Sequence, residues 1–242
     1  MATILEKHKK VWEEKKILRG IYEEWYKKII SHLSKGEGKT LELGAGSGNF
    51  KEFFPGAVSA DIENCDWLDM CFDAHSMPFE NNKLSNLVMI DVLHHLYNPV
   101  KFLEEADRVL EKGGRVVMLE PYPSPFSLRV YRKFHPEPFE FEEDYFLKTD
   151  VQEKDPWHSN QAIPYLIFFK HVEKFNKKFG GIFKIEKIEK LSFILYPLSG
   201  GFENKSMIPD SLIPVFKRLE KLAKPLSSLI AFRCFVVLEK IH

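Results

Sequence analysis

Apolar residues recur every four positions between residues 17 and 33, and this spacing predicts an amphipathic helix. The repeating residues are Ile17, Ile21, Trp25, Ile29 and Leu33. Gly36 and Gly38 are expected to end the helix. A more polar helical pattern over residues 5–16 precedes it, so residues 1–38 are predicted to form a helical cap.

After Gly38, short continuous apolar runs alternate with helical patterns. The runs are Thr40–Leu43, Ala57–Ala60, Trp67–Phe72, Asn86–Ile90 and Arg115–Leu119. A helix is predicted over Pro99–Glu111, ended by Gly113 and Gly114. Buried strands that alternate with helices indicate an α/β fold, doubly wound around a mainly parallel sheet.

The alternation breaks at Glu120, where prolines and aromatic residues become frequent. Residues 121–180 are therefore predicted to be an insertion or lid, with a helix over Asn160–Phe179. Phe183–Leu195 and Ala231–Ile241 are predicted strands. Asp210–Ile230 is a predicted helix, broken at Pro214 and Pro225. In the last strand, Phe232, Cys234 and Val236 should alternate with Arg233, Phe235 and Val237.

Charge disfavours nucleic acid as a partner. Thirty-five basic residues balance thirty-five acidic ones, so no overall field attracts a polyanion. Residues 135–155 hold eight acids and two lysines, which would repel a phosphate backbone. Basic residues also gather at Lys217–Lys224, where a solvated helix face explains them.

The three cysteines, Cys65, Cys71 and Cys234, form no regular spacing. Reduced thiols are expected, which is typical of a cytoplasmic protein. No run approaches the roughly eighteen apolar residues of a membrane span, so no spanning segment is expected.

The clearest chemical signal is a turn with glycine at every second position. Gly44, Gly46 and Gly48 directly follow the first predicted strand, and a helix is predicted behind them. Glycine permits a sharp turn and a close approach of ligand to backbone. A helix N-terminus offers free N–H groups, and open α/β sheets bind ligands at this edge.

Two other nucleotide-binding motifs fit less well. A nicotinamide site has the pattern G-x-G-x-x-G, and Asn49 occupies its last position here. Gly38-Lys39-Thr40 matches the end of a phosphate-binding loop, but Leu33 stands at its first glycine position. This second match also precedes its strand, so we treat it as accidental.

Four ordered segments resemble the class I S-adenosylmethionine-dependent methyltransferases, in particular the methyltransferase type 11 group. Residues 42–48 (ELGAGSG) resemble motif I of that superfamily. Residues 73–79 (DAHSMPF) resemble its D-A-x-x-L-P-F segment, and residues 90–96 (IDVLHHL) its V-L-x-H segment after the fourth strand. Residues 98–118 resemble the run into the fifth strand.

The resemblance implies a seven-stranded sheet in the order 3-2-1-4-5-7-6, with the last strand antiparallel. It also implies S-adenosylmethionine as cofactor and S-adenosylhomocysteine as product. The implied cofactor-binding residues are Glu42, Gly44, Ala45, Gly46, Gly48, Asp61, Ile62, Asp73, Ala74, Asp91, Val92 and Leu93. Among them, Asp61 suits a ribose diol. Only eleven residues separate Asp61 from Asp73, so the usual helix there should be missing or reduced to a turn.

Methyl transfer depends mainly on aligning the two reactants and excluding water. His94 and His95 are the candidate catalytic bases, although hydrogen bonding that fixes the loop explains His95 better than catalysis does and explains His94 equally well. Glu120 and Tyr122 could face an acceptor, but Glu120 suits a loop anchor or surface residue better. Asp91, His94 and His95 lack a regular metal-ligand spacing, so no metal is predicted.

We therefore expect one domain with four parts. Residues 1–38 form the helical cap, 39–120 the cofactor-binding half, 121–180 an insertion on the acceptor side, and 181–242 the rest of the sheet. The expected function is methyl transfer to a small or medium-sized molecule, such as a metabolite, sugar or lipid precursor. The acceptor should meet Glu120–Asp155 and Tyr196–Pro209. A non-catalytic protein of this fold and a nicotinamide oxidoreductase are the alternatives.

Overall fold

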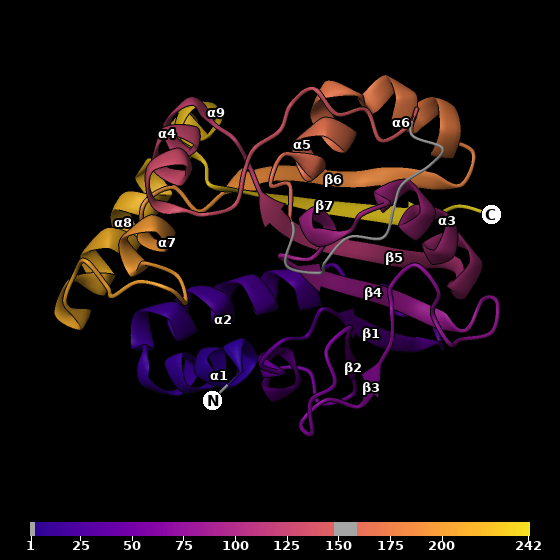
Figure 1. Ribbon diagram of the computed structural model, residues 1–242, viewed down its shortest axis with the longest axis horizontal. Coiled ribbons are helices and arrows are strands. Elements are labelled where there is room, and N and C mark those ends of the chain that lie inside the picture. The colour runs from indigo at the N-terminus through magenta and orange to yellow at the C-terminus, as the bar shows by residue number, and fades with distance from the viewer. Residues whose placement is uncertain (1–2, 148–158) are drawn as a thin grey trace.

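A seven-stranded sheet crosses the computed structural model, which describes residues 3–147 and 159–242 (Figure 1). Its order is β3-β2-β1-β4-β5-β7-β6, with β7 antiparallel to both neighbours and the other pairs parallel. The strands are β1 Lys39–Leu43, β2 Val58–Asp61, β3 Met70–Cys71, β4 Leu84–Ile90, β5 Leu110–Pro121, β6 Phe183–Leu191 and β7 Arg233–Lys240. The predicted sheet order and the antiparallel last strand are confirmed.

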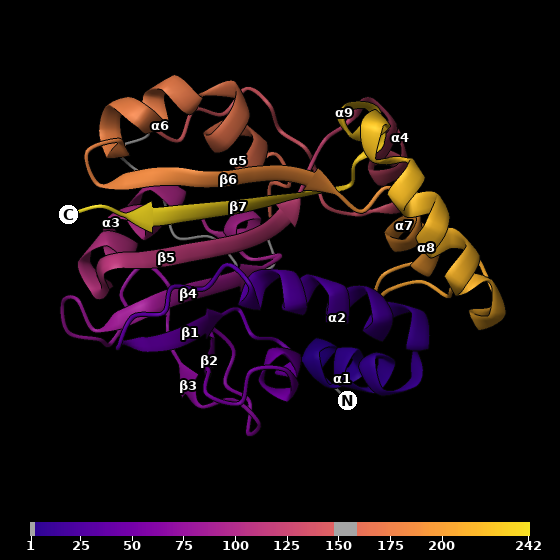
Figure 2. The ribbon, with the colours of Figure 1, turned by 180° about the vertical axis from the view of Figure 1, so that it is seen from behind.

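Helices cover both faces of the sheet and form an arm at one end (Figures 1 and 2). They are α1 Ile4–Glu14, α2 Lys16–Ile30, α3 Pro99–Val109, α4 Pro125–Phe134, α5 Ile163–Tyr165, α6 Val172–Phe179, α7 Leu195–Ser199, α8 Ile213–Leu222 and α9 Ser227–Ile230. The arm consists of α4, α7, α8 and α9, and it projects beyond the ends of β6 and β7.

Side chains that alternate along the strands divide the interior into two cores. Cys234 and Val236 of β7 pack with α3 and α6 in the first core. Phe235 and Val237 point the other way and pack with α2 in the second core. This alternation confirms the pattern predicted for the last strand and explains why the central strands are apolar on both faces.

The N-terminal helices form as the periodicity predicts. Thr3 and Glu6 make a capping box that starts α1. The repeating face of α2 is buried, and the helix ends at Ile30, so that Leu33 lies beyond it. Both helices pack beside the glycine-rich turn, where Tyr26 contacts Phe50.

Two predicted elements near the glycine-rich turn are shorter than expected. The predicted strand Trp67–Phe72 is reduced to Met70–Cys71, because the Asp69 carboxylate accepts hydrogen bonds from the N–H and hydroxyl of Ser59 and holds a turn. The helix predicted after Gly48 is a single 3-10 turn, Asn49–Glu52. Pro55 follows closely and disfavours helical geometry in the residue before it.

Other boundaries shift for similar local reasons. The helix predicted to Glu111 ends at Val109, because Leu110 already pairs with Leu84 of β4. The helix predicted over Asn160–Phe179 is divided into α5, a π-helical segment at Leu166–Lys170 and α6. The strand predicted to Leu195 stops at Leu191. Residues 62–69 form no helix, as expected from the short Asp61–Asp73 spacing.

Candidate functional site

A cavity of about 1680 Å³ lies at the carboxyl ends of β1, β2 and β4. The glycine-rich turn and the loops after β2 and β4 line one side, and α1, α2, α4 and residues 194–207 line the other. Pockets for a single ligand usually enclose roughly 300–1,000 Å³. This cavity therefore has room for a cofactor and a second molecule together.

The glycine-rich turn has a backbone that requires glycine. Gly44, Gly46 and Gly48 have φ angles of +61°, +52° and +75°, in the left-handed region. A Cβ on Gly44 would also lie 2.3 Å from a methyl carbon of Val92. The N–H of Gly46 donates to the Asp61 carboxylate at 2.9 Å, which ties the turn to the end of β2.

Glu42 lies buried in the cavity wall, and one of its carboxylate oxygens has no hydrogen-bond partner among the described residues. Burial, and then the nearby charge of Asp61, raise the pKa of Glu42 to about 8. A cationic ligand group that approached this buried carboxyl group would stabilise its ionised form. The glycine-rich turn therefore faces a position that suits a cation.

Ten of the twelve predicted cofactor residues line this cavity. They are Glu42, Gly44, Ala45, Gly46, Asp61, Ile62, Asp73, Ala74, Asp91 and Val92. Gly48 and Leu93 are not among the lining residues. Gly48 lies behind the turn beside Trp67, and Leu93 is fully buried in the first core. Their contribution is therefore to the shape of the turn and the loop.

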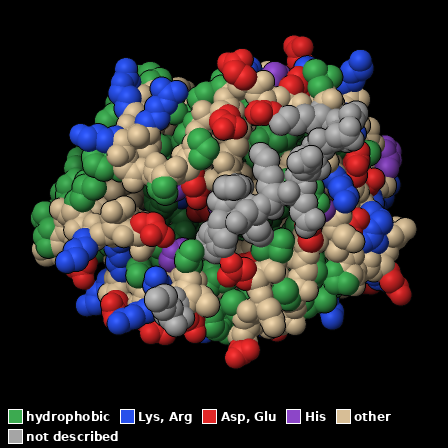
Figure 3. All heavy atoms as spheres, in the orientation of Figure 1, with side chains coloured by type: hydrophobic (Ala, Val, Ile, Leu, Met, Phe, Trp, Pro, Cys, Tyr) green, Lys and Arg blue, Asp and Glu red, His purple; other side chains and the backbone are tan. Residues whose placement is uncertain are grey.

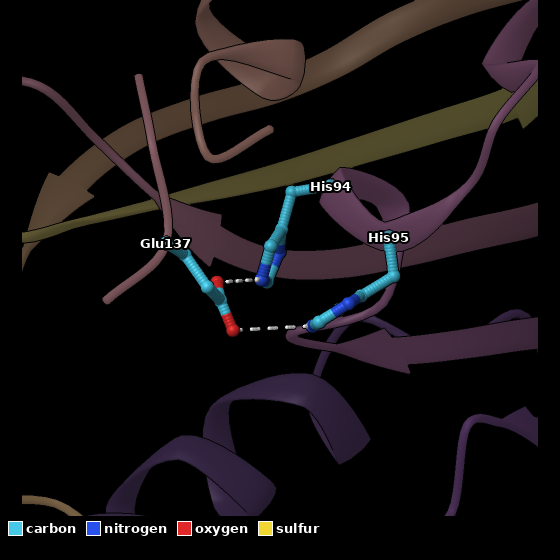
Figure 4. Close-up of side chains that lie close together, drawn as sticks. All are labelled: His94, His95 and Glu137. Atoms are coloured by element: carbon cyan, nitrogen blue, oxygen red, sulfur yellow. Dashed lines mark ion pairs between the residues drawn. The ribbon is translucent and has the colours of Figure 1, made fainter. Parts of the chain in front are cut away.

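The two candidate bases have different surroundings (Figure 4). His94 is buried, with Nδ1 2.7 Å from a Glu120 oxygen and Nε2 3.5 Å from a Glu137 oxygen. His95 is half-buried and lines the cavity, with Nε2 3.9 Å from the other Glu137 oxygen. Glu137 extends toward both rings from the chain after α4.

Glu120 is a loop anchor and not a surface residue. It lies within β5, is fully buried, and accepts hydrogen bonds from the N–H groups of Val92 and Leu93. Tyr122 also does not face the cavity, since it packs against Tyr165 and Phe169. The interpretation of Glu120 as a loop anchor is thus confirmed, and a position at the surface is not.

The two carboxylates determine the charge of His94. Burial by itself lowers the pKa of this imidazole, but Glu120 and Glu137 outweigh burial and raise the pKa to about 10. The pKa of Glu137 is held below its usual range despite burial, chiefly by His94. His94 is therefore an imidazolium at neutral pH and has no site for a further proton.

Among the residues that the structure describes, two groups of side chains each bring three possible metal ligands within 4.8 Å of one another. One group is His94, His95 and Glu137, and the other is Asp91, His94 and Glu120. Both groups contain His94, which must lose a proton before it can bind a metal. The ion pairs satisfy these groups without an ion, and the absence of a metal stays a prediction.

Arg233 is a site residue that the sequence analysis did not identify. Its guanidinium is buried in the cavity floor, where it pairs with Asp91 and donates to the Tyr196 hydroxyl. Asp91 has a φ of +59°, a strained value for a residue other than glycine. An arginine directly before the apolar run Cys234–Leu238 was the available signal, because a buried charge requires a partner.

The regions expected to meet an acceptor do line the cavity, although much of their aromatic content packs inside. Tyr131 is buried and Phe139 packs on the first core, whereas Phe126 and Phe134 are about half exposed at the cavity wall. Phe202 lines the cavity from the other side. The helical cap also contributes, through Tyr22 and Tyr26, which the sequence analysis missed. Residues 148–158 of the predicted insertion, His158 included, lie outside the described residues.

The free energy of unfolding should fall as the pH rises from about 6.5 to about 10. Folding raises the pKa of His94, so its stabilisation is complete below the unfolded value of 6.5 and is lost through the folded value. The pKa values of Glu120 and Glu137 are lowered, so their stabilisation is complete above about 4.5 and is lost only as the pH falls below that value. Denaturant unfolding across this range should show the stability gap between the wild type and His94→Gln narrowing toward pH 10. A constant gap would contradict the ion pairs, and His242→Gln is the control.

Comparison with known proteins finds a methyltransferase domain in about a third of the chain. The family model described as a methyltransferase domain matches residues 41–118. An uncharacterized protein of Methanocaldococcus jannaschii is 29% identical over 121 residues, which are 47% of this chain and 57% of that protein. This chain therefore matches little more than half of that relative.

Two solved structures superpose over nearly the whole chain. A methyltransferase dependent on S-adenosylmethionine from Archaeoglobus fulgidus has a TM-score of 0.56 at 16% identity, covering 95% of this chain and 97% of that one. One from Thermotoga maritima, described as a possible histamine N-methyltransferase, has a TM-score of 0.56 at 14% identity, covering 99% and 96%. At these identities the likeness concerns the fold.

Proposed function

We propose that this protein methylates a small or medium-sized molecule. The chain has the fold of the class I S-adenosylmethionine-dependent methyltransferases, and part of it matches a methyltransferase domain. The observation that carries the proposal is the buried Glu42 carboxyl group, which has an unpartnered oxygen beside the glycine-rich turn. S-adenosylmethionine has an ammonium group on its amino-acid part, and this cation would satisfy Glu42. The residues present therefore fit the cofactor.

The remaining cavity residues suit the other parts of S-adenosylmethionine. Asp61 ends β2 at the cavity, and its carboxylate would accept hydrogen bonds from the ribose hydroxyls. Gly44 and Gly46 allow the backbone to approach the ligand closely. Ile62, Asp73 and Ala74 lie together on the side where the adenine would bind.

The cofactor supplies a methyl group activated by its sulfonium, so the protein mainly aligns the acceptor and excludes water. The cavity is large enough for both reactants. Aromatic residues from α2, α4 and residues 196–202 enclose the space beyond the glycine-rich turn. This lining favours an apolar or ring-shaped acceptor. The Thermotoga maritima protein is described as a possible histamine N-methyltransferase, and histamine is a small amine, which supports an acceptor of this size.

His95 is the candidate base if the acceptor must lose a proton. It lines the cavity, and its Nε2 lies near the Glu137 carboxylate, which would stabilise the imidazolium formed after proton transfer. His94 is already protonated, so its role is to position Glu137 and the loop after β4. Glu120 holds this loop by accepting hydrogen bonds from the N–H groups of Val92 and Leu93.

Calorimetric titration with S-adenosylmethionine, S-adenosylhomocysteine and NADH tests the proposal. The first two should bind at one site, and NADH should not. Between about pH 5 and 7, binding should release a proton, because the pKa of about 8 at Glu42 falls when an ammonium group approaches. Measurement in buffers with different ionisation enthalpies detects that proton, and Glu42→Gln should abolish its release.

Two results would count against the proposal. Preferential binding of NADH would favour the oxidoreductase alternative. Absence of binding by both S-adenosyl compounds would favour a non-catalytic protein of the same fold. If both compounds bind, a screen of amines, phenols and carboxylic acids with methyl-labelled cofactor identifies the acceptor class.

A further inference from the structure

Exposed apolar residues gather on the helical arm at one end of the molecule. Along residues 212–229 they recur at intervals of three and four residues. They are Leu212, Val215, Leu219, Leu222, Leu226 and Leu229. Leu222 is 75% exposed and the two leucines after it more than half exposed. In Figure 3 several apolar side chains lie at the surface of this end of the molecule. A solvated helix face does not explain such a stripe.

The stripe is not the face by which α8 attaches to the body. Ile213 and Phe216 pack against the second core, whereas no residue of α8 is buried. Helix α8 thus has apolar side chains both on the face that packs against the protein and on the face that meets solvent. Helix α4 packs against α9 and extends the same surface with the exposed rings of Phe126 and Phe134.

Basic residues surround this apolar surface, although the chain as a whole has no net charge. Exposed basic side chains of α4 and the α8–α9 segment are Arg129, Arg132, Lys133, Arg218, Lys221 and Lys224. Residues 121–136 contain no acid, and residues 211–230 contain only Glu220. The Glu220 carboxylate turns inward and accepts hydrogen bonds from the N–H groups of residues 193–195. Figure 3 shows basic side chains above and below the apolar ones.

We propose that the surface formed by α4, α8 and α9 docks onto a membrane that contains anionic lipids. Apolar residues that would enter the headgroup region and basic residues beside them are the two features of interfacial helices. A second copy of this chain is a poorer partner, because it would bring basic groups against basic groups. Phe126 and Phe134 also line the cavity, so its mouth would open toward the lipid. The proposal concerns docking and does not depend on methyl transfer.

Co-sedimentation with phosphatidylcholine vesicles, with and without phosphatidylglycerol, tests the docking. The full chain should bind the anionic vesicles and bind the neutral ones far less. Each basic residue near an anionic surface strengthens binding about fivefold. Arg218→Glu with Lys221→Glu should therefore weaken binding by about 25-fold or more. Lys112→Glu with Lys177→Glu, both exposed and outside the surface, is the matched control and should bind as the wild type does.

The apolar stripe is tested separately. Leu222→Ser with Leu226→Ser should weaken binding about tenfold or more, since both leucines would leave water on docking. Leu147→Ser, which changes an exposed leucine elsewhere, should have no effect. Binding of the unaltered protein should also weaken as sodium chloride is added, which needs no variant.

Three outcomes would overturn the proposal. The first is failure of the wild type to bind anionic vesicles. The second is binding that the paired substitutions leave unchanged in variants with wild-type circular dichroism. The third is a concentration-dependent dimer in analytical ultracentrifugation that Leu222→Ser with Leu226→Ser dissociates, which would assign the surface to a second copy. None of the helices within residues 3–147 and 159–242 has the length and apolar character of a membrane span.

Discussion

Asp61→Ala should weaken the binding of S-adenosylmethionine by roughly two to four orders of magnitude. Hydrogen bonds to a charged group contribute about 1.5–3 kcal/mol each, and a ribose diol would make two to this carboxylate. The alanine also removes the acceptor for the N–H of Gly46, which loosens the glycine-rich turn. Isothermal calorimetry with the cofactor measures the loss.

Matched variants separate the ribose contact from a general effect on the loop. Asp61→Asn retains an acceptor for Gly46 but loses the charge, so its affinity should lie between those of the wild type and Asp61→Ala. Asp66→Ala removes an exposed acid of the same loop outside the cavity and should bind normally. An Asp61→Ala protein that is folded and keeps its affinity would refute the assigned ribose contact.

Glu120→Ala should lower the free energy of unfolding by about 3–5 kcal/mol, because it leaves the buried His94 without one of its two carboxylates. Two backbone N–H groups lose their acceptor as well. For a chain of this length the expected fall in Tm is on the order of 10 °C. Denaturant unfolding monitored by circular dichroism measures the change.

Two further variants are the controls for Glu120→Ala. Glu120→Gln keeps an amide oxygen for the backbone N–H groups, so it should cost less than alanine. Glu239→Ala breaks the half-exposed ion pair with Arg115 and should cost no more than about 1 kcal/mol. If Glu120→Ala costs no more than Glu239→Ala, the buried ion pairs around His94 do not stabilise the fold.

The apolar runs identified most of the strands, because a strand that is buried on both faces consists mainly of consecutive apolar residues. Their order in the sheet came from the resemblance of residues 42–118 to the methyltransferase superfamily, since periodicity carries no information on which strands are neighbours. The boundaries were less accurate. The turn held by Asp69 and the pairing of Leu110 with Leu84 are contacts between segments, and they overrode local preferences.

The cofactor side of the site was predictable for a physical reason. Turn glycines and a carboxylate at the end of a strand lie within short segments, and the sheet brings those segments to one edge. Ten of the twelve predicted residues accordingly line the cavity. Gly48 and Leu93 lie outside the cavity lining, because Gly48 is on the side of the turn next to Trp67 and Leu93 is buried in the first core.

The sequence by itself determined the class of fold, the sheet edge where the cavity lies and the glycine-rich turn that lines it. Only the tertiary structure decided the charge of His94, which depends on Glu120 from β5 and Glu137 from the chain after α4. It likewise joined Arg233 to Asp91 and turned Glu220 inward, away from the basic arm. Such electrostatic effects act through space between distant parts of the chain, and they depend on burial that no local pattern of residues specifies.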